Sequence, residues 1–461
     1  MISVSFIFFS FSSAIALLLT SYVAYHVIIA PRFNPLRKLA GPPLNGPLHN
    51  HMSPVLDPFR SPRTHAAYVE KYGRNVRIRG LGPWDERLLP LDPVSVAHVL
   101  KNSTIYEKPW QSRRLITSLI GCGMLAAEGH VHKRQRRVAT PAFSIQNMRA
   151  LVPLVFSKGE ELKDKWMNMS QAVASEKQNS GQVEIDICHW ISRATFDVIG
   201  LAAFLLRIKE MFEIAVSQGD AFRTVMGIYF PILNRLFKTI RRVAGKLVQQ
   251  KKSRIMDGEK SGSDTTSLAL TWTFLLLAKH PDLQTRLRKE LLSIMPTTPI
   301  SRLSCEEIES LHNTLQKLTI LEQFHSSLRV ATQDDEIPVS YPVHLSDGTI
   351  SEQKSISVSK GSFVHVPVEA FNLDKGIPDR WDHLSEDVLS LPGLYSNLLT
   401  FSAGPRSCIG MRFSMIEMKT FLYILLTTFS FAETDKRIYK ANFKKGSQCP
   451  LIVTPLESIA T

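Results

Sequence analysis

The sequence predicts a mainly α-helical protein with a minor β region, preceded by an N-terminal transmembrane helix. Helical patterns extend over residues 61–72, 186–199, 268–278 and 411–422. Shorter runs have the composition of β-strands, at residues 75–79, 86–91, 328–332, 355–358 and 362–366. The first two of these runs are expected to form a hairpin.

The loop at residues 401–410 contains the residue best suited to carry chemistry. Its sequence is Phe-Ser-Ala-Gly-Pro-Arg-Ser-Cys-Ile-Gly, and a helical run follows it directly. A cysteine before a helix faces unpaired backbone N–H groups and the positive end of the helix dipole, and both favour its thiolate. Such a thiolate is a suitable metal ligand. A lone cysteine is otherwise most often a buried structural residue.

The spacing of this loop favours the metal ligand over the structural cysteine. The loop resembles the haem-binding signature Phe-x-x-Gly-x-Arg-x-Cys-x-Gly of cytochrome P-450 monooxygenases at all of its fixed positions, which are Phe401, Gly404, Arg406, Cys408 and Gly410. The resemblance implies that Cys408 is the axial ligand of a haem iron. Arg406 would pair with a propionate or a phosphate, and Gly410 would let the backbone approach a flat cofactor.

The composition is that of an ordinary globular protein, with 44% hydrophobic and 21% charged residues. A formal net charge of +14 predicts a basic face, which by itself suits nucleic acid, acidic lipid headgroups or an acidic protein. The five cysteines are odd in number and include no Cys-x-x-Cys pair. This argues against a disulfide framework or a zinc site and for a reducing compartment.

The N-terminal segment is expected to anchor the protein in a membrane. Residues 1–30 contain no Lys, Arg, Asp or Glu, and their apolar run is long enough for a bilayer-spanning helix. A cleaved signal peptide is the alternative, but a basic beginning is missing and the apolar run is too long. Arg32, Arg37 and Lys38 follow, which predicts that the rest of the chain is cytosolic.

The next segments complete the predicted organisation. Residues 31–50 are a proline-rich hinge, and residues 51–461 are expected to form the haem-thiolate domain. Microsomal members of the family begin with the same anchor and hinge. The resemblance therefore implies a single-pass protein of the endoplasmic reticulum membrane.

Residues 128–137, Glu-Gly-His-Val-His-Lys-Arg-Gln-Arg-Arg, are rich in basic side chains. On composition alone they are a solvated basic helix face or a nucleic-acid patch. They also resemble the family helix whose Trp-x-x-x-Arg binds the haem propionates, with His132 in place of Trp and Arg136 at the Arg position. Residues four apart share a helix face, so both could reach one propionate. The remaining cations would dock an acidic reductase, with no nucleic acid among the partners.

Residues 261–266, Ser-Gly-Ser-Asp-Thr-Thr, open a long apolar run that Pro281 ends. This run resembles the central helix of the family, which carries the motif Ala/Gly-Gly-x-Asp/Glu-Thr. The resemblance implies that Asp264 and Thr265 steer protons during the reaction. From the residues alone, Ser263 or Asp264 is equally well a helix N-cap.

One part of the family pattern is missing. No Glu in the chain is followed three residues later by Arg, and Glu322 and His325 lie near the expected place without that spacing. The partner loop is present at residues 378–381, where Arg380 would have lost its carboxylate. Apparent gaps near residues 201–215, 256–262, 315–327 and 376–378 predict an internally shortened chain. Arg329, on a predicted strand, is either a propionate contact or a surface arginine.

The resemblance implies a haem-dependent monooxygenase that inserts one oxygen atom of O2 into a small apolar organic substrate. The electrons would come from NADPH through a reductase, and thiolate ligation favours O–O cleavage. Two alternatives stay open. One is a membrane-anchored haem-binding protein with little or no turnover, and the other is a damaged or mis-spliced product that does not fold around haem. The substrate cannot be read, because pocket residues follow no local pattern.

Overall fold

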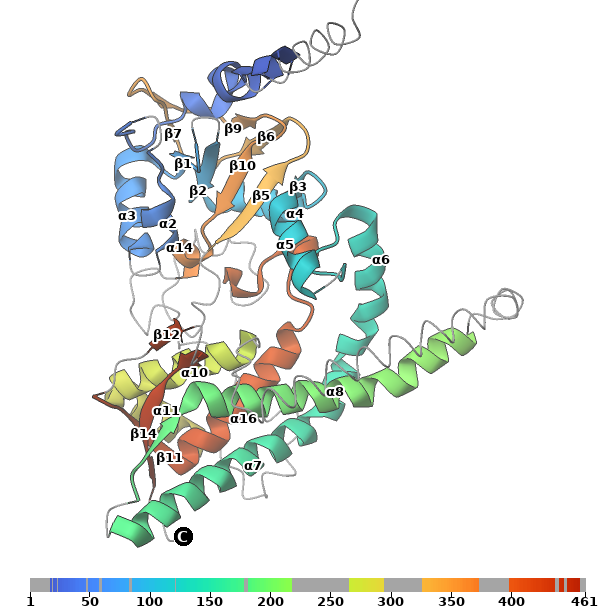
Figure 1. The fold of residues 1–461 in the computed structure, drawn as a ribbon, viewed down its shortest axis with the longest axis vertical. Coiled ribbons are helices and arrows are strands. Elements are labelled where there is room, and N and C mark those ends of the chain that lie inside the picture. Colours follow the sequence, from blue (N-terminus) through green and yellow to red (C-terminus); the bar gives the residue numbers. More distant parts are fainter. Residues whose placement is uncertain are drawn as a thin grey trace, which may run out of the picture. The chain divides into compact units, whose positions relative to one another are not determined.

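The computed structural model describes the chain as two compact units (Figure 1). The first unit comprises Met1–Val138 and Leu321–Cys408, and the second comprises Ala139–Ile320 and Ile409–Thr461. The described residues are 17–18, 20–22, 24–46, 49–57, 60–82, 85–120, 122–177, 181–217, 265–293, 326–372, 398–435, 439–442 and 446–456. The domain boundaries expected at residues 30 and 50 stay predictions.

The helices of the first unit are mostly short. They are η1 (Tyr25–Ile29), η2 (Ala30–Phe33), η3 (Pro35–Lys38), α2 (Met52–Leu56), α3 (Ser61–Tyr72), α4 (Pro93–Lys101), α5 (Trp110–Ile120), α6 (Gly129–Ala139), α14 (Val368–Asn372), η7 (Leu399–Phe401) and η8 (Gly404–Arg406). Local signals set the start of α4, because the Asp92 carboxylate accepts a hydrogen bond from Val94 N at 2.9 Å and Pro93 occupies the first turn. The predicted helix at residues 61–72 is confirmed as α3.

A five-stranded sheet runs through the first unit in the order β1-β2-β10-β5-β3 (Figure 1). Its strands are β1 (Asn75–Arg79), β2 (Glu86–Pro90), β3 (Tyr106–Glu107), β5 (Ser327–Ala331) and β10 (Phe363–Val366). β2 and β10 are parallel, and the other neighbours are antiparallel. The predicted hairpin is confirmed as β1 and β2, and two further predicted strands are confirmed as β5 and β10 to within one residue.

The register of the sheet assigns its side chains to two faces. Phe363 is the partner of Arg87, whereas the next residue, Val364, is the partner of Arg329. Because successive residues of a strand point to opposite faces, Arg329 and Phe363 lie on different sides of the sheet. Leu328, one residue before Arg329, lies on the side of Phe363.

Apolar clusters cover both faces. On the side of Arg329, the cluster joins Leu88 and Val364 of the sheet to α4, to Leu399 of η7 and to Ala403 of the cysteine loop, residues 401–410. On the other side, the cluster consists of Met52, Val55, Val76, Ile78, Leu89 and Leu91, with α3 packed against it. The cysteine loop therefore packs on the face of the sheet that carries Arg329.

Two small sheets complete the first unit. β6 (Asp335–Pro338) pairs with β9 (Ser355–Val358), and β7 (Val343–His344) pairs with β8 (Ile350–Ser351). The predicted strand at residues 355–358 is thus confirmed as β9, although it pairs in a different sheet from β10. Asp335 ties β6 to the rest of the unit, because its carboxylate lies 2.8 Å from His98 Nε2 and accepts from the Tyr106 hydroxyl at 2.7 Å.

The second unit combines long helices with a small sheet. Its helices are η4 (Thr140–Phe143), α7 (Ile145–Lys177), α8 (Ile187–Ser217), α10 (Thr265–Lys279), α11 (Pro281–Ser293) and α16 (Met411–Thr428). Three strands pair in the order β11-β14-β4, with bounds Phe429–Glu433, Pro450–Pro455 and Val183–Asp186. A separate ribbon joins β12 (Tyr439–Asn442) and β13 (Gly446–Gln448). The helical patterns at residues 186–199, 268–278 and 411–422 are confirmed as parts of α8, α10 and α16.

Close packing and aromatic contacts hold this unit together. Gly159 of α7 lies against α16, because a Cβ at this position would meet Ile424 Cδ1 at 2.5 Å. The rings of Trp166 and Phe429 are 5.9 Å apart, and those of Phe274 and Phe431 are 4.7 Å apart. The helix that follows the cysteine loop, α16, is therefore closely packed in the core of this unit.

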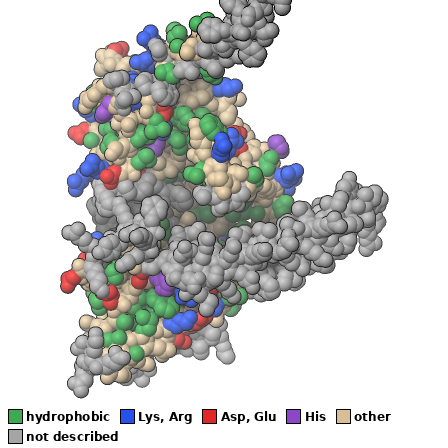
Figure 2. Space-filling view, in the orientation of Figure 1, with side chains coloured by type: hydrophobic (Ala, Val, Ile, Leu, Met, Phe, Trp, Pro, Cys, Tyr) green, Lys and Arg blue, Asp and Glu red, His purple; other side chains and the backbone are tan. Residues whose placement is uncertain are grey.

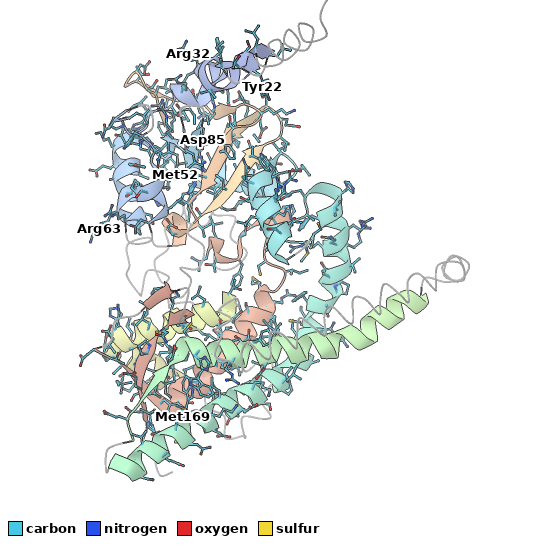
Figure 3. All side chains as sticks on the ribbon, in the orientation of Figure 1. Tyr22, Arg32, Met52, Arg63, Asp85 and Met169 are labelled. Carbon is cyan, nitrogen blue, oxygen red and sulfur yellow. The ribbon has the colours of Figure 1, made fainter. Side chains whose placement is uncertain are left out.

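The membrane anchor is not decided by the fold. Within the described residues, no helix has both the length and the apolar character that crossing a membrane requires. More than half of residues 1–30 lie outside the described part of the chain, and Tyr22 and Arg32 mark the described end of this segment in Figure 3. The transmembrane helix and the location in the endoplasmic reticulum stay predictions.

Candidate functional site

The cysteine loop is a tight turn closed by a backbone hydrogen bond. Cys408 N donates to Phe401 O at 2.8 Å, and the Cys408 side chain lies at the surface of the described residues. Ser402 has a φ of 58° and Gly404 a φ of 65°, so the chain reverses through the left-handed region twice. A Cβ on Gly404 would lie 2.5 Å from Leu100 O at the end of α4. Glycine is therefore required at this position by both conformation and space.

The two residues directly before Cys408, Arg406 and Ser407, are held by contacts with the segment that precedes and forms α6. Arg136 donates to Ser407 O at 2.6 Å and to Ser407 Oγ at 3.3 Å. Arg406 donates to Ala127 O at 2.5 Å and forms an ion pair with Glu128. The cysteine loop is thus attached to the segment that precedes and forms α6, although nearly 300 residues separate them in sequence.

Glu128 connects this attachment to a third segment. Its carboxylate accepts from Lys108 N at 3.2 Å and lies 3.6 Å from Lys108 Nζ, while its other oxygen pairs with Arg406. The side chains of Glu128 and Arg406 are only 5% and 6% exposed. Lys108 and Glu128 were not predicted as site residues, and the only signal in the sequence is that Glu128 is the one acid in the basic run of residues 128–137.

Positive charge accumulates around this carboxylate. We call the following residues the basic cluster: Lys108, Arg113, His132, Arg136, Arg329 and Arg406. Burial and the charges of Arg406, Arg329 and Arg113 lower the pKa of Lys108 to about 7. The Glu128 carboxylate, which is shared with Arg406, opposes this effect only in part. The buried position of Lys108 among these cations therefore makes its ammonium group less basic than that of an ordinary lysine.

His132 and Arg329 are buried members of the basic cluster. Burial, followed by the charges of Arg136 and Lys108, lowers the pKa of His132. Burial also lowers the pKa of Arg329, which is 6% exposed and makes no ion pair or side-chain hydrogen bond with any described residue. A buried arginine without a carboxylate is costly. The basic cluster is thus built to receive an anion.

Helix α6 separates its cations by face, as its spacing predicts. His132 is buried and Arg136 is half-buried, whereas Lys133, Arg134 and Arg137 are exposed. The inward face contributes to the basic cluster, and the outward face is available to a partner.

The comparisons identify the family. The cytochrome P450 family model matches residues 60–258 and 252–455, so the chain belongs to the cytochrome P450 family. The chain is 26% identical to cytochrome P450 monooxygenase 128 of Postia placenta, with 94% of this chain and 96% of that protein aligned. It is 27% identical to cytochrome P450 monooxygenase 205 of the same fungus, with 96% and 97% aligned. Ganoderic acid synthetase of Ganoderma lucidum is 27% identical, with 77% and 81% aligned.

Membership of this family defines the class of enzyme and its cofactor. The chain is a haem-thiolate monooxygenase that uses haem b, O2 and an organic substrate, with electrons supplied by a redox partner. The described residues fit this cofactor, because a haem has two carboxylates and the basic cluster has more cations than carboxylates. Cys408 would hold the iron, and His132, Arg329 and Lys108 would hold the propionates. Arg136 and Arg406 also lie here, but their observed partners are Ser407, Ala127 and Glu128.

The other predicted site residues belong to the second unit or lie outside the described residues. Thr265 is the first residue of α10 and is exposed, while its neighbour Thr266 is buried with its hydroxyl 2.6 Å from Ser414 Oγ. Gly410 is the N-cap of α16, with a φ of −89° that any residue adopts. Asp264, Glu322, His325 and Arg380 lie outside the described residues.

The Glu128→Gln substitution tests whether this carboxylate holds the site together. Gln keeps the shape of the side chain but leaves Arg406 and Lys108 without a negative charge, so we expect the cofactor-free protein to lose about 3 kcal/mol of stability. Bound haem should reduce this loss, because its propionates restore negative charge. Chemical unfolding of the full chain with and without haem measures both effects.

Glu107→Gln is the matched control. Glu107 pairs with Arg113 at 3.4 Å, but both side chains are partly exposed, so its loss should cost about 1 kcal/mol or less. Equal losses in the two variants, or a loss in Glu128→Gln that haem does not reduce, would contradict the assignment.

Proposed function

We propose that this chain is a membrane-anchored monooxygenase that inserts one oxygen atom of O2 into a small apolar organic substrate. Its electrons come from NADPH through a reductase. The observation that carries the proposal is the cysteine loop, whose Ala403 packs in the apolar cluster on the face of the sheet that carries Arg329, a buried residue that pairs with no described carboxylate. When bound, haem supplies the oxygen-activating redox chemistry that amino-acid side chains lack.

The residues of this chain bind and orient the cofactor. Cys408 provides the thiolate, and the turn through Ser402 and Gly404 fixes where its sulfur points. His132 and Arg329 supply hydrogen-bond donors and positive potential for the propionates. Asp264 and Thr265 are proposed to move protons during the reaction, on the strength of their resemblance to the family motif.

A second candidate is a haem-binding protein with little or no turnover. The alignment to the first Postia relative runs over 541 positions, more than the 461 residues of this chain, so parts of that relative have no counterpart here. The family model also matches in two overlapping pieces, which meet near residues 252–258. Both observations agree with the missing Glu-x-x-Arg spacing and support a shortened chain. The same observations also support the alternative that the chain is a damaged or mis-spliced product.

The Cys408→Ala substitution tests the thiolate ligand. The haem-loaded, reduced protein should bind carbon monoxide with the strongly red-shifted Soret band of thiolate-ligated haem, and the variant should lose that band completely. An unchanged spectrum in the variant would overturn the assignment. Substrate-dependent consumption of NADPH with a reductase then separates the enzyme from the protein that binds haem without turnover.

The exposed face of α6 is proposed to dock the reductase. Reversing the charges of Lys133, Arg134 and Arg137 should weaken reductase association about tenfold or more at low salt and should flatten its salt dependence. Haem content should not change, because His132 and Arg136 point inward. Loss of haem without loss of association would show that the roles are reversed.

A control variant with the same change in net charge can be made by reversing lysines on other elements. On the face drawn in Figure 2, Lys and Arg side chains are dispersed among the described residues rather than gathered in one patch. Lys71, Lys289 and Lys354 are exposed and belong to other parts of the chain. Reversing these three should leave reductase association within about twofold of the wild type if docking depends on position rather than on net charge.

The membrane anchor is proposed on the uncharged apolar run of residues 1–30 and the cations after it. We place the protein in the endoplasmic reticulum membrane with its body in the cytosol. Alkaline carbonate extraction of membranes should leave the full-length chain in the pellet, and a chain that begins at residue 31 should be released. Release of the full-length chain would contradict the anchor.

A further inference from the structure

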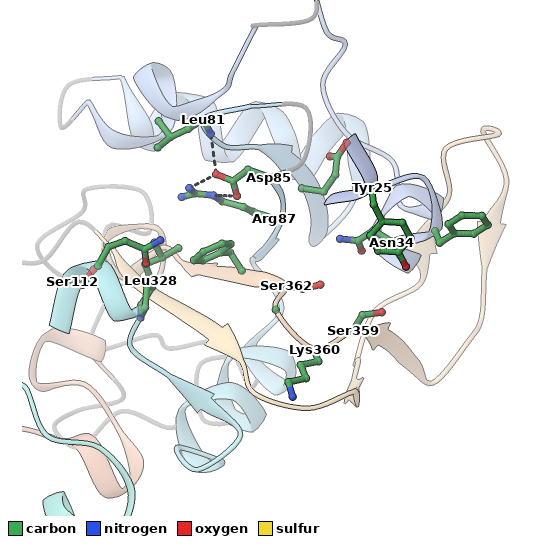
Figure 4. A pocket seen from close by; sticks show the side chains of 16 residues that line it. Tyr25, Asn34, Leu81, Asp85, Arg87, Ser112, Leu328, Ser359, Lys360 and Ser362 are labelled. Carbon is green, nitrogen blue, oxygen red and sulfur yellow. Dashed lines mark hydrogen bonds and ion pairs between the residues drawn. The ribbon is translucent and has the colours of Figure 1, made fainter. Parts of the chain in front are cut away.

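The first unit contains a pocket on the face of the sheet opposite to Arg329. Its volume is about 780 Å³, within the range of small-molecule sites. The β1–β2 hairpin, the start of α5, the beginnings of β5 and β10 and the N-terminal segment all contribute to its wall. Phe363 and Leu328 line it, and Leu328 is labelled in Figure 4. Their neighbours Val364 and Arg329 lie on the other face of the sheet, where Val364 belongs to the cluster that includes Ala403. The pocket is therefore a different site from the basic cluster.

The pocket lining has one ammonium group that forms no ion pair with a described residue, although the Asp334 carboxylate accepts from the backbone N of the same lysine, Lys360, at 2.7 Å. Arg87 donates to both oxygens of Asp85, at 2.8 and 2.5 Å, and Leu81 N donates to the same carboxylate at 2.9 Å (Figure 4). Glu86 pairs with Arg79 at 3.2 Å. The remaining charged residue of the lining is Lys360, whose ammonium group forms no ion pair with a described residue. The lining therefore favours a ligand with a single negative charge.

Hydroxyl groups accompany this lysine. Ser359, Lys360 and Ser362 lie on one turn between β9 and β10, closed by a hydrogen bond from Ser362 N to Ser359 O at 3.0 Å (Figure 4). Ser362 is 5% exposed as a residue and lines the pocket, so its hydroxyl can donate a hydrogen bond to a ligand there.

Part of the remaining wall is apolar and poorly covered. Leu81 is 75% exposed and Phe33 is 80% exposed, although both line the pocket. The Phe363 ring lies under the guanidinium of Arg87, with 5.1 Å between the Arg87 carbon and the ring centroid. Large apolar side chains that gather exposed around a pocket indicate an apolar ligand.

We propose that this pocket binds a single-chain amphiphile with one carboxylate, such as a long-chain fatty acid. The carboxylate is held by the ammonium group of Lys360 and the hydroxyl of Ser362. The hydrocarbon chain runs along Phe363 and Leu328 and covers Leu81 and Phe33. Binding at this site does not require haem or turnover, so it can be tested separately from the proposed function.

The test uses the full-length protein in nanodiscs of neutral phosphatidylcholine and measures binding of dodecanoate and of dodecanol by equilibrium dialysis. Empty nanodiscs correct for partition into lipid. The wild type should bind dodecanoate saturably and about tenfold more tightly than dodecanol, because only the carboxylate can pair with Lys360. Lys360→Met should weaken dodecanoate binding about tenfold and leave dodecanol binding unchanged.

Lys354→Met is the matched control, because Lys354 is also exposed and lies outside the pocket. It should leave dodecanoate binding as in the wild type. Leu81→Ser should weaken both ligands, since it removes part of the apolar wall at an exposed position that the fold tolerates. Three results would overturn the proposal: no saturable binding of dodecanoate, equal affinity for the two ligands, or equal effects of Lys354→Met and Lys360→Met.

Discussion

The ion pair between Glu128 and Arg406 is the contact on which the candidate site depends. It joins the loop that carries Cys408 to the segment that begins α6, and it shares its carboxylate with Lys108. Arg136 adds a second attachment one residue further along the same loop, at Ser407. Consecutive residues before the cysteine are therefore fixed by one helix and its approach. The sulfur can be presented in a defined position only because these attachments hold the turn.

The same arrangement explains why the site needs its cofactor. Burial lowers the pKa of Lys108, His132 and Arg329, and neighbouring cations lower the pKa of Lys108 and His132 further. Such a cluster destabilises the folded chain until an anion enters it. A ligand that binds the native state stabilises it in proportion to its affinity, so haem should contribute to folding as well as to chemistry. In the protein without haem, Glu128 limits this destabilisation because its carboxylate neutralises part of the positive charge of the basic cluster.

Structural features that depend on neighbouring residues could be predicted from the sequence, whereas contacts between residues far apart in the chain could not. The signature of the cysteine loop, the hairpin of β1 and β2 and the bounds of α3 follow from local patterns, and all three were predicted. The inward and outward faces of α6 follow from its spacing, and they were predicted too. Lys108 and Glu128 were missed because their importance comes from Arg406, far away in the chain. The pocket beside Lys360 was missed because its wall joins the N-terminal segment, a hairpin and two distant strands. That β9 and β10 pair in different sheets also depends on distant partners.

The central claim is that the basic cluster of the first unit is a binding site for the carboxylates of haem. The most direct measurement is a titration of the cofactor-free, full-length protein with haem and with haem dimethyl ester, which keeps the iron and the ring but has no negative charges. If the claim is right, the ester binds at least about tenfold more weakly, which corresponds to about 1.4 kcal/mol. In the Arg329→Met variant this difference should shrink. Equal affinities of the wild-type protein for haem and for its ester would contradict the account.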